Sequence, residues 1–175
     1  DLTSVFSAFE KKIDPYCGTE DDTHDTYKLA SANSRARLRM MTLYQIAQSH
    51  NGIVVGTGNR VEDFGVGFFT KYGDGGVDIS PIGDCMKTDV WDMGRELGLL
   101  QSIIDAPPTD GLWSDGRTDE DQLGMTYADL EVAMRMDLGE MQCDSAELIN
   151  NLDRYRVIRN RSLHKMNPIP VFKKS

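Results

Sequence analysis

The segment Phe68–Asp78, with the sequence FFTKYGDGGVD, combines residue types whose chemistry exceeds what a turn or a strand requires. Its central cation, Lys71, follows two aromatic residues and precedes three glycines and two carboxylates. A solvent-exposed hairpin has no need of the aromatic side chains, and a buried segment does not tolerate Lys71 beside Asp74 and Asp78. The pattern therefore predicts a functional segment with Lys71 at its centre.

A second candidate site follows the β-branched run Ile53–Val55, whose next residues are GTGN. Ligands of open parallel sheets bind beyond the carboxyl ends of the strands, where glycines would let a ligand approach the backbone and Thr57 and Asn59 offer hydrogen bonds. Glu62 could hold Mg²⁺ near phosphates, because Mg²⁺ takes only one or two protein carboxylates. The alternative for Glu62 is an acid in the first turn of a helix, and G-x-G alone is a weak nucleotide-binding signal.

Three arginines alternate along the chain at positions 35, 37 and 39. On a helix, Arg35 and Arg39 share a face while Arg37 points roughly the opposite way, so one face or the other is expected to meet an anion. The sequence contains no Walker A loop, H-E-x-x-H, G-x-S-x-G or catalytic Cys/His pattern, and its three histidines are isolated. Protease or lipase chemistry with a nucleophilic side chain therefore lacks support.

The elements that position these residues are expected to be helices around a parallel sheet. Helical periodicity, capping residues and glycine stops predict helices at 2–13, 35–49, 87–97, 126–136 and 145–161, separated by loops that include 14–26, 65–84 and 109–124. The helix 35–49 would be capped by Asn33 or Ser34 and would bury a stripe made of Ala36, Met40, Leu43 and Ala47. The glycine-flanked run Ile53–Val55 is typical of a buried parallel strand, which favours an α/β fold.

Length and composition indicate one globular domain: the chain has 175 residues, of which 39% are hydrophobic and 27% charged, and a net charge of −9. No apolar run reaches the ~18 residues of a membrane span and no signal segment opens the sequence, so neither a membrane nor secretion is expected. Three cysteines without C-x-x-C spacing fit a reducing cytoplasm. Residues 154–175 hold seven of the 19 Lys and Arg residues and no acid, which indicates either an anion site or a solvated tail. The acidic remainder disfavours nucleic acid as a partner.

Taken in order, segments across nearly the whole chain resemble the ammonia-dependent NAD synthetase family. They are N-x-x-A-R-x-R-M-M at Asn33–Met41, V-V-G-T-G-N-R-x-E at Val54–Glu62, F-F-T-K-Y-G-D-G-G-x-D at Phe68–Asp78, P-x-G-D-x-x-K-T at Pro81–Thr88, P-P-T at Pro107–Thr109, T-D-E-D-x-L-G at Thr118–Gly124, and His164-Lys165.

The resemblance implies an N-type ATP pyrophosphatase with a Rossmann-like fold of the adenine nucleotide alpha-hydrolase kind, a parallel sheet with flanking helices, assembled as a cytoplasmic homodimer. Such enzymes adenylate the nicotinate carboxylate of deamido-NAD with ATP, release pyrophosphate, and let ammonia displace AMP. The activation is needed because a carboxylate is a poor electrophile until one oxygen leaves with AMP, and Mg²⁺ and cations offset the crowding of negative charge.

The resemblance also implies roles for individual residues. Thr57, Lys87 and Thr109 would contact ATP, and Glu62 would ligate Mg²⁺. Contacts to deamido-NAD would come from Arg37, Lys71, Asp78, His164 and Lys165. Lys71 and Lys87 would be the catalytic cations, and Lys87 opens a predicted helix whose N-terminus favours phosphate.

The sequence departs from the family in one motif. The pyrophosphate loop S-G-G-x-D-S, which the resemblance places before the region equivalent to Asp1, does not occur in the 175 residues. We therefore expect residues 1–175 to be the C-terminal portion of a synthetase domain, inactive alone. The alternatives are a non-catalytic nucleotide-binding or assembly module that kept half of the site, and a dinucleotide-dependent dehydrogenase, for which the complete G-x-G-x-x-G is missing.

Overall fold

The computed structural model describes residues 1–17, 25–113 and 115–174, and these residues group into two compact units. The first unit comprises the described residues of Asp1–Gly56, Thr70–Ile79 and Leu112–Ser114; the second comprises those of Thr57–Phe69, Ser80–Gly111 and Asp115–Ser175. The segments singled out by the sequence are therefore divided, because the chain leaves the first unit after Gly56 and enters it again at Thr70.

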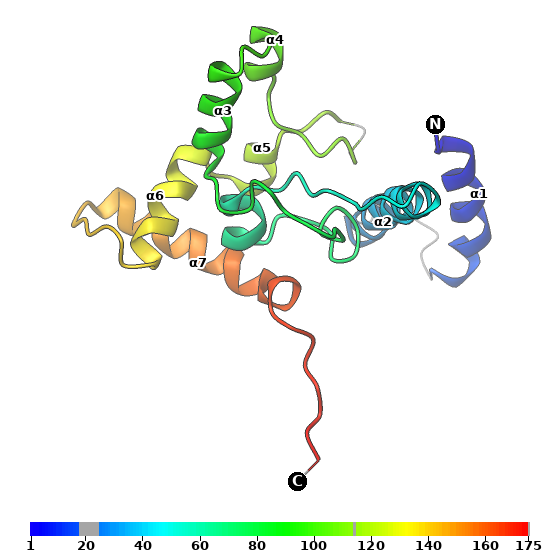
Figure 1. Ribbon diagram of the computed structural model, residues 1–175. Helices are drawn as coiled ribbons and strands as arrows, with labels where there is room; N and C mark the ends of the chain where they lie inside the picture. Colours follow the sequence, from blue (N-terminus) through cyan, green and yellow to red (C-terminus); the bar gives the residue numbers. More distant parts are fainter. Residues whose placement is uncertain (18–24, 114, 175) are drawn as a thin grey trace. The chain divides into compact units, whose positions relative to one another are not determined.

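The first unit is built on two helices, α1 (Thr3–Ile13) and α2 (Asp25–Ser49), with the short 3₁₀ helix η1 (Asp14–Tyr16) after α1 (Figure 1). The predicted helix 2–13 is confirmed. Phe6 is 5% exposed, and the Arg35 guanidinium lies 4.8 Å from the centre of its ring. A hydrogen bond of 2.5 Å from the Ser31 hydroxyl to Glu10 links the two helices.

The prediction for the start of α2 was wrong by ten residues, because α2 begins at Asp25 and not at Arg35. Asn33 was expected to cap the helix, but it lies inside α2 and its side-chain oxygen accepts a hydrogen bond of 2.6 Å from the Thr70 hydroxyl. A tertiary contact thus uses the group that looked like a cap. Residues 18–24 of the predicted loop lie outside the described residues.

The predicted apolar stripe of α2 is buried only in part. Ala36 is 5% exposed and Met40 lies against Gly76, whereas Leu43 is 54% exposed, so the expectation fails for Leu43. The physical reason is that the segment around Gly76 covers α2 near Met40, while among the described residues Leu43 has no comparable cover.

The predicted strand Ile53–Val55 makes one parallel β-bridge, from Val55 to Ile79, supported by hydrogen bonds from Asp78 N to Val54 O (2.9 Å) and from Gly56 N to Ile79 O (2.7 Å). The parallel direction agrees with the prediction. Within the described ranges there is no longer strand, so the parallel sheet itself stays a prediction.

The second unit contains six helical elements (Figure 1). They are the π-helix η2 (Arg60–Val66), α3 (Lys87–Glu96), α4 (Gln101–Ile104), α5 (Asp119–Leu123), α6 (Tyr127–Asp137) and α7 (Ala146–Met166). The predicted helices 87–97 and 126–136 are confirmed. The helix predicted to end at Arg161 continues to Met166, which brings the pair at 164–165 into its last turn.

The loops predicted at 65–84 and 109–124 need correction, because η2 reaches into the first and α5 lies in the second. Both elements are too short for hydrophobic periodicity to show. Thr118 caps α5 by accepting a hydrogen bond from Asp121 N, and Asp121 accepts one from Thr118 N in return. The signal for α5 was this capping box, T-D-E-D.

The core of the second unit lies where α6 packs against α7 and η2 (Figure 1). Its buried members are Val61, Val66, Met86, Leu123, Met125, Tyr127, Leu130, Ala133, Met134 and Tyr155. Tyr127 and Tyr155 are each 1% exposed, so this core contains two buried phenol groups that need polar partners.

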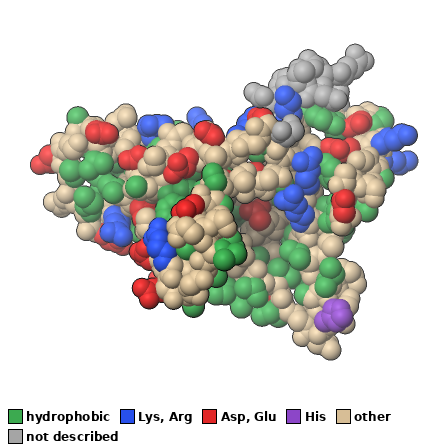
Figure 2. All heavy atoms as spheres, turned by 90° about the horizontal axis from the view of Figure 1, so that it is seen from above, with side chains coloured by type: hydrophobic (Ala, Val, Ile, Leu, Met, Phe, Trp, Pro, Cys, Tyr) green, Lys and Arg blue, Asp and Glu red, His purple; other side chains and the backbone are tan. Residues whose placement is uncertain are grey.

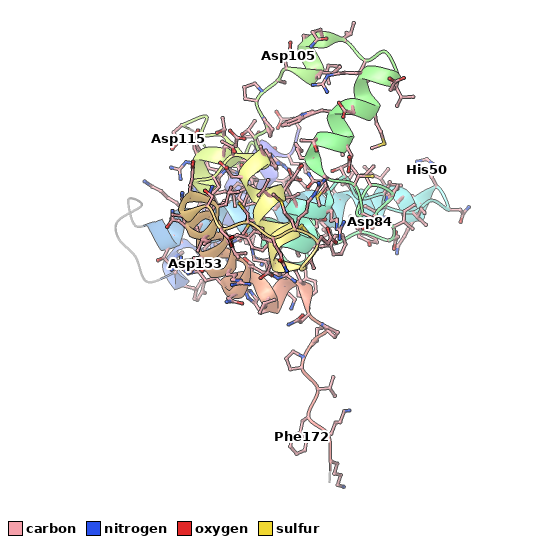
Figure 3. All side chains as sticks on the ribbon, turned by 90° about the vertical axis from the view of Figure 1, so that its left-hand side faces the viewer. His50, Asp84, Asp105, Asp115, Asp153 and Phe172 are labelled. Atoms are coloured by element: carbon pink, nitrogen blue, oxygen red, sulfur yellow. The ribbon has the colours of Figure 1, made fainter. Side chains whose placement is uncertain are left out.

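The surface carries hydrophobic side chains among charged ones, as the face in Figure 2 shows. After α7 the chain is extended, and Phe172, labelled in Figure 3, is 92% exposed. No helix in the described part of the chain combines the length and the apolar composition that crossing a bilayer requires.

Candidate active site

Glu62 lies in the first turn of η2, the position that the alternative interpretation of this residue predicted. The cap of η2 is Asn59, 2% exposed, whose side-chain oxygen accepts hydrogen bonds of 3.0 Å from the backbone N–H groups of Val61 and Glu62. Asn59 was expected to offer this group to a ligand. The structure uses it to fix the backbone at Glu62 instead.

The other end of η2 is held by α7. Gly67 adopts φ 64°, and a Cβ there would lie 2.6 Å from the Cβ of Ser162, so a side chain would meet both strain and a steric clash. Arg159 donates to the carbonyls of Phe64 (2.5 Å) and Gly65 (2.6 Å). Side chains of α7 thereby supply hydrogen bonds to carbonyl groups that the end of a helix leaves without partners.

Glu62 and Lys87 are 25 residues apart in the chain and meet in the second unit. Lys87 is the first residue of α3, and its ammonium group lies 3.0 Å from Glu62 Oε1. The Lys87 side chain is only 17% exposed and the Glu62 side chain only 14%. The structure therefore joins the predicted metal ligand and the predicted ATP-binding lysine in one mostly buried ion pair at a helix N-terminus.

Tyr127, the first residue of α6, closes this pair from the core side. Its hydroxyl donates a hydrogen bond to Glu62 Oε1 and also lies 3.1 Å from Asp119 Oδ2, and its ring lies 4.8 Å from the Lys87 ammonium. Asp119 is 7% exposed, and its Oδ1 is buried with no hydrogen-bond partner among the described residues. Two carboxylates thus share one hydroxyl.

The electrostatics follow from this arrangement. Burial, together with the charge of Glu62, raises the pKa of the Asp119 carboxyl, while the hydrogen bond from Tyr127 opposes that shift. Burial and then the neighbouring Glu62 charge raise the pKa of the Tyr127 hydroxyl, so it stays a donor at any physiological pH. Because the hydroxyl has one proton, Tyr127 can donate to only one of the two carboxylates at a time.

A further residue of α6 fixes the start of α3. Glu131, 6% exposed, accepts hydrogen bonds from the backbone N–H (3.0 Å) and the hydroxyl (2.8 Å) of Thr88. Tyr127 and Glu131 are four residues apart and therefore share one face of α6. That face holds both members of the Glu62–Lys87 pair in place.

Of the remaining residues predicted to bind ATP, Thr57 and Thr109 are both exposed. The Thr109 hydroxyl donates to the carbonyl of Arg117 (3.2 Å) and accepts from Gly111 N (3.3 Å), which shapes its own loop. The contacts described here do not join Thr57 or Thr109 to the Glu62–Lys87 pair, although all four residues belong to the second unit.

The first unit brings Arg37 close to Lys71. Arg37, which is exposed, donates from Nε to the backbone carbonyl of Lys71 (3.2 Å), and the Lys71 ammonium lies 5.5 Å from the centre of the Tyr72 ring. Tyr72 has φ 64°, a conformation that costs energy in a residue with a side chain. Backbone strain thus occurs directly beside the predicted catalytic lysine.

Asp78 also belongs to the first unit and is exposed. Its Oδ2 accepts a hydrogen bond of 2.7 Å from Val54 N, and its Oδ1 accepts one of 3.3 Å from the Tyr44 hydroxyl. The predicted substrate-binding carboxylate therefore also secures the bridged segment Val54–Val55.

The pair His164-Lys165 lies in the last turn of α7, in the second unit. His164 is exposed and Lys165 donates to the carbonyls of Gly67 and Phe69, both at 2.9 Å. Arg154 and Arg159, in the same basic end, also bind backbone carbonyls of the second unit. The interpretation of this end as only a solvated tail is therefore wrong for these three cations.

The donor set limits how a metal could be held. Among the described residues no group of three or more His, Cys, Asp or Glu side chains could hold an ion. Both hydrogen-bond contacts of the Glu62 carboxylate fall on Oε1. A single carboxylate with an oxygen to spare suits Mg²⁺, which takes most of its ligands from phosphate and water.

Sequence reasoning missed Tyr127, Asp119, Glu131 and the capping role of Asn59. The T-D-E-D and T-Y-A-D segments were visible, but they were interpreted only as caps or as part of the resemblance. A tyrosine at the first position of an amphipathic helix is no signal by itself, since its ring suits a core equally well.

The chain is similar to a known family and to named proteins of several organisms. Residues 1–173 match the family model described as NAD synthase. The NH(3)-dependent NAD(+) synthetase of Carboxydothermus hydrogenoformans is 46% identical over 142 residues, which are 81% of this chain and 54% of the relative. The protein of the same name from Methanosarcina acetivorans is 39% identical over an alignment of 178 positions, which covers 97% of this chain and 66% of the relative.

Among solved structures, NMN synthetase from Francisella tularensis aligns with a TM-score of 0.81 and 35% identity over 99% of this chain and 65% of that one. NAD+ synthetase from Burkholderia pseudomallei aligns with a TM-score of 0.65 and 27% identity over 93% of this chain and 58% of that one. The chain therefore spans between about half and two thirds of the length of these relatives and has their fold over that part.

Proposed function

We propose, because this chain belongs to the NAD synthase family, that the protein carrying it uses ATP to amidate the nicotinate carboxylate of deamido-NAD with ammonia. A carboxylate oxygen attacks the α-phosphorus of ATP while the bond to the β-phosphate breaks and pyrophosphate leaves. Ammonia then attacks the activated carbonyl carbon and loses a proton, the carbon–oxygen bond breaks, and AMP departs. NAD, AMP and pyrophosphate are the products.

The observation that carries this proposal is the contact of Lys87 with Glu62 at the N-terminus of α3. A lysine ammonium at a helix N-terminus favours phosphate through its own charge and through the helix dipole. A carboxylate at this position would repel phosphate unless a second cation binds to it together with the polyanion. The pair therefore suits a Mg²⁺-bound triphosphate.

Mg²⁺ would be held by Glu62 and by phosphate oxygens. When bound, it neutralises triphosphate charge and lowers the barrier to attack on phosphorus. Lys87 would then turn from Glu62 toward phosphate, and Thr57 and Thr109 would contact ATP. Each of these residues belongs to the second unit.

For deamido-NAD we assign the residues that the family resemblance implies, Arg37, Lys71, Asp78, His164 and Lys165. Lys71 is the second catalytic cation, placed to stabilise the negative charge that develops on the substrate. Arg37 and Lys165 donate to backbone carbonyls, and Asp78 accepts a hydrogen bond from a backbone N–H group. Their orientation is therefore set before a ligand arrives.

A second acceptor substrate is favoured by the likeness to NMN synthetase, whose structure covers 99% of this chain at 35% identity. The same steps on nicotinate mononucleotide would give NMN. The non-catalytic module is not favoured, because the relatives compared above are named as synthetases.

We further infer that the chain forms one domain with a parallel sheet and that the protein is a cytoplasmic homodimer. The parallel bridge at Val55 and Ile79 supports the sheet, and the described cysteines are all free. Sedimentation equilibrium would give the mass of the assembly, and a monomer at micromolar concentration would contradict the dimer.

The test is a steady-state assay of the protein that contains this sequence, with ATP, Mg²⁺, ammonium, and either deamido-NAD or nicotinate mononucleotide. We expect amide and pyrophosphate in equal amounts with at least one acceptor. Glutamine in place of ammonium serves as the control for the nitrogen source. ATP binding without any amide from either acceptor would support the non-catalytic module instead.

A further inference from the structure

The strongest unassigned feature of the second unit is a buried polar contact at the back of the Glu62–Lys87 pair. Tyr127 is 1% exposed and lies in the apolar core, yet its hydroxyl touches two carboxylates. A phenylalanine would fill the same space and pack against Trp91, whose ring centre lies 6.0 Å from that of Tyr127. Packing therefore explains the ring but not the hydroxyl.

We propose that Tyr127 is a positioning residue whose hydroxyl orients the Glu62 carboxylate for the cation that accompanies ATP, a proposal that rests on the proposed function. The hydroxyl binds Oε1 and leaves Oε2 of Glu62 available as a ligand. Lys87 binds the same Oε1 at 3.0 Å, and once Lys87 turns toward phosphate, the Tyr127 hydroxyl remains as the donor that fixes this oxygen and thereby sets the direction of the other.

Asp119 supports this role from the opposite side of the hydroxyl. Its Oδ2 lies 3.1 Å from the Tyr127 oxygen, and its Oδ1 is buried without a partner among the described residues. A buried carboxyl oxygen with no partner lowers stability, so a core selected for stability alone would not contain it. The Tyr127 hydroxyl is instead confined between two acidic groups, which restricts its rotation.

The ring of Tyr127 contributes in a different way. The Lys87 ammonium lies 4.8 Å from the ring centre, so the aromatic face also locates the cation that pairs with Glu62. A substitution that keeps the ring and removes the hydroxyl therefore separates the two contributions. Tyr127→Phe is that substitution.

The experiment measures Mn²⁺ binding in the presence of ATP by electron paramagnetic resonance, on the whole protein that contains this sequence. Removing a hydrogen-bond partner of a metal ligand typically weakens metal binding about 10–100-fold, and we expect a weakening of about 10-fold for Tyr127→Phe. The matched control is Tyr155→Phe, which removes a phenol hydroxyl from the same core at the same exposure of 1%. Its Mn²⁺ affinity should stay within about twofold of the wild type, because the Tyr155 hydroxyl lies beside Gly65, toward the other end of η2 from Glu62.

Thermal unfolding of both variants tells stability apart from positioning. If Tyr127→Phe and Tyr155→Phe lower Tm alike while only Tyr127→Phe weakens Mn²⁺ binding, the positioning role holds. If Tyr127→Phe binds Mn²⁺ as the wild type does, the role is overturned, whatever its Tm.

Glu62→Gln distinguishes this failure from failure of the proposed function. Unchanged Mn²⁺ binding in Glu62→Gln would remove Glu62 as a metal ligand and with it the basis of the proposed function. Weakened binding in Glu62→Gln with unchanged binding in Tyr127→Phe would leave the proposed function standing and contradict only the inference about Tyr127.

Discussion

The two units hold their predicted site residues in different ways. In the second unit, Glu62 and Lys87 contact each other and Tyr127, and each is mostly buried. In the first unit, Arg37 and Asp78 are exposed and bind backbone groups, while Lys71 lies beside a strained tyrosine. The second unit presents a network of side chains, and the first presents side chains anchored to main chain.

The difference indicates at which residues a substitution affects both ligand binding and the stability of the fold. In a mostly buried ion pair each charge is stabilised by the other, so loss of either partner affects folding as well as function. An exposed side chain whose role is to meet a ligand can be removed with little effect on folding. The two units should therefore respond differently to equivalent substitutions of their catalytic lysines.

The largest effect is expected for Lys71→Ala, in the first unit. Losing a cation that stabilises developing charge should lower kcat/KM about 10²–10³-fold. The Tm should change by no more than about 2–4 °C, the equivalent of about 1 kcal/mol, because Lys71 is only partly buried. Steady-state kinetics and calorimetry measure the two effects. Lys28→Ala, at an exposed lysine of α2, is the control, and an active Lys71→Ala variant would refute the role of Lys71.

Next comes Lys87→Ala, in the second unit, which should affect stability and activity together. It leaves the Glu62 carboxylate without its cation in a mostly buried site, and breaking such a pair costs about 3 kcal/mol. Urea unfolding at pH 7 measures this cost. A stability equal to that of the wild type would remove the contrast between the two units.

How much of this contrast the sequence could predict depends on the kind of contact. The residue types around Lys71 predicted a functional segment directly, whereas the roles predicted for Glu62 and Lys87 came from the resemblance of their segments to a family. Tyr127, Asp119 and Glu131 act through contacts 8 to 65 residues apart in the chain, which no local pattern encodes. The start of α2 was misplaced for the same reason, because Asn33 fits a cap locally and a tertiary partner at Thr70 decided its role.

A smaller effect is expected for Gly67→Ala, compared with Gly98→Ala. Both glycines have φ near +65°, at 64° and 68°, but only Gly67 faces a neighbouring atom, Ser162 Cβ at 2.6 Å from an added Cβ. Strain alone should cost about 1 kcal/mol at Gly98, and the clash should raise the cost at Gly67 by about 2 kcal/mol. Chemical denaturation of both variants gives the difference. Equal costs would show that η2 is not held tightly against α7.

The smallest effect concerns the pH dependence of stability through Asp119, which faces Glu62, Lys87, Tyr127 and Asp110. Burial raises its pKa in the folded state, so the folded protein binds the proton more tightly than the unfolded chain does. The stability it contributes is therefore present below the ordinary pKa of 3.8 and is lost as the pH rises through the folded pKa.

Asp119→Asn removes this dependence, since the amide stays neutral and can donate to the Tyr127 oxygen. At pH 7 the variant should unfold about 2–4 °C above the wild type, and the gap should shrink toward pH 4. Calorimetry across this pH range measures the gap. A gap that widens as the pH falls would contradict the assignment of Asp119 as a carboxyl with a raised pKa.

Activation of the nicotinate carboxylate by transfer of the AMP group to one of its oxygens can be followed with deamido-NAD labelled with ¹⁸O in that carboxylate. Mass spectrometry of the products formed with ATP and ammonium identifies the phosphate that receives the label. We expect one ¹⁸O atom in AMP and none in pyrophosphate. Label in a phosphate other than that of AMP, or ADP as the nucleotide product, would contradict this activation.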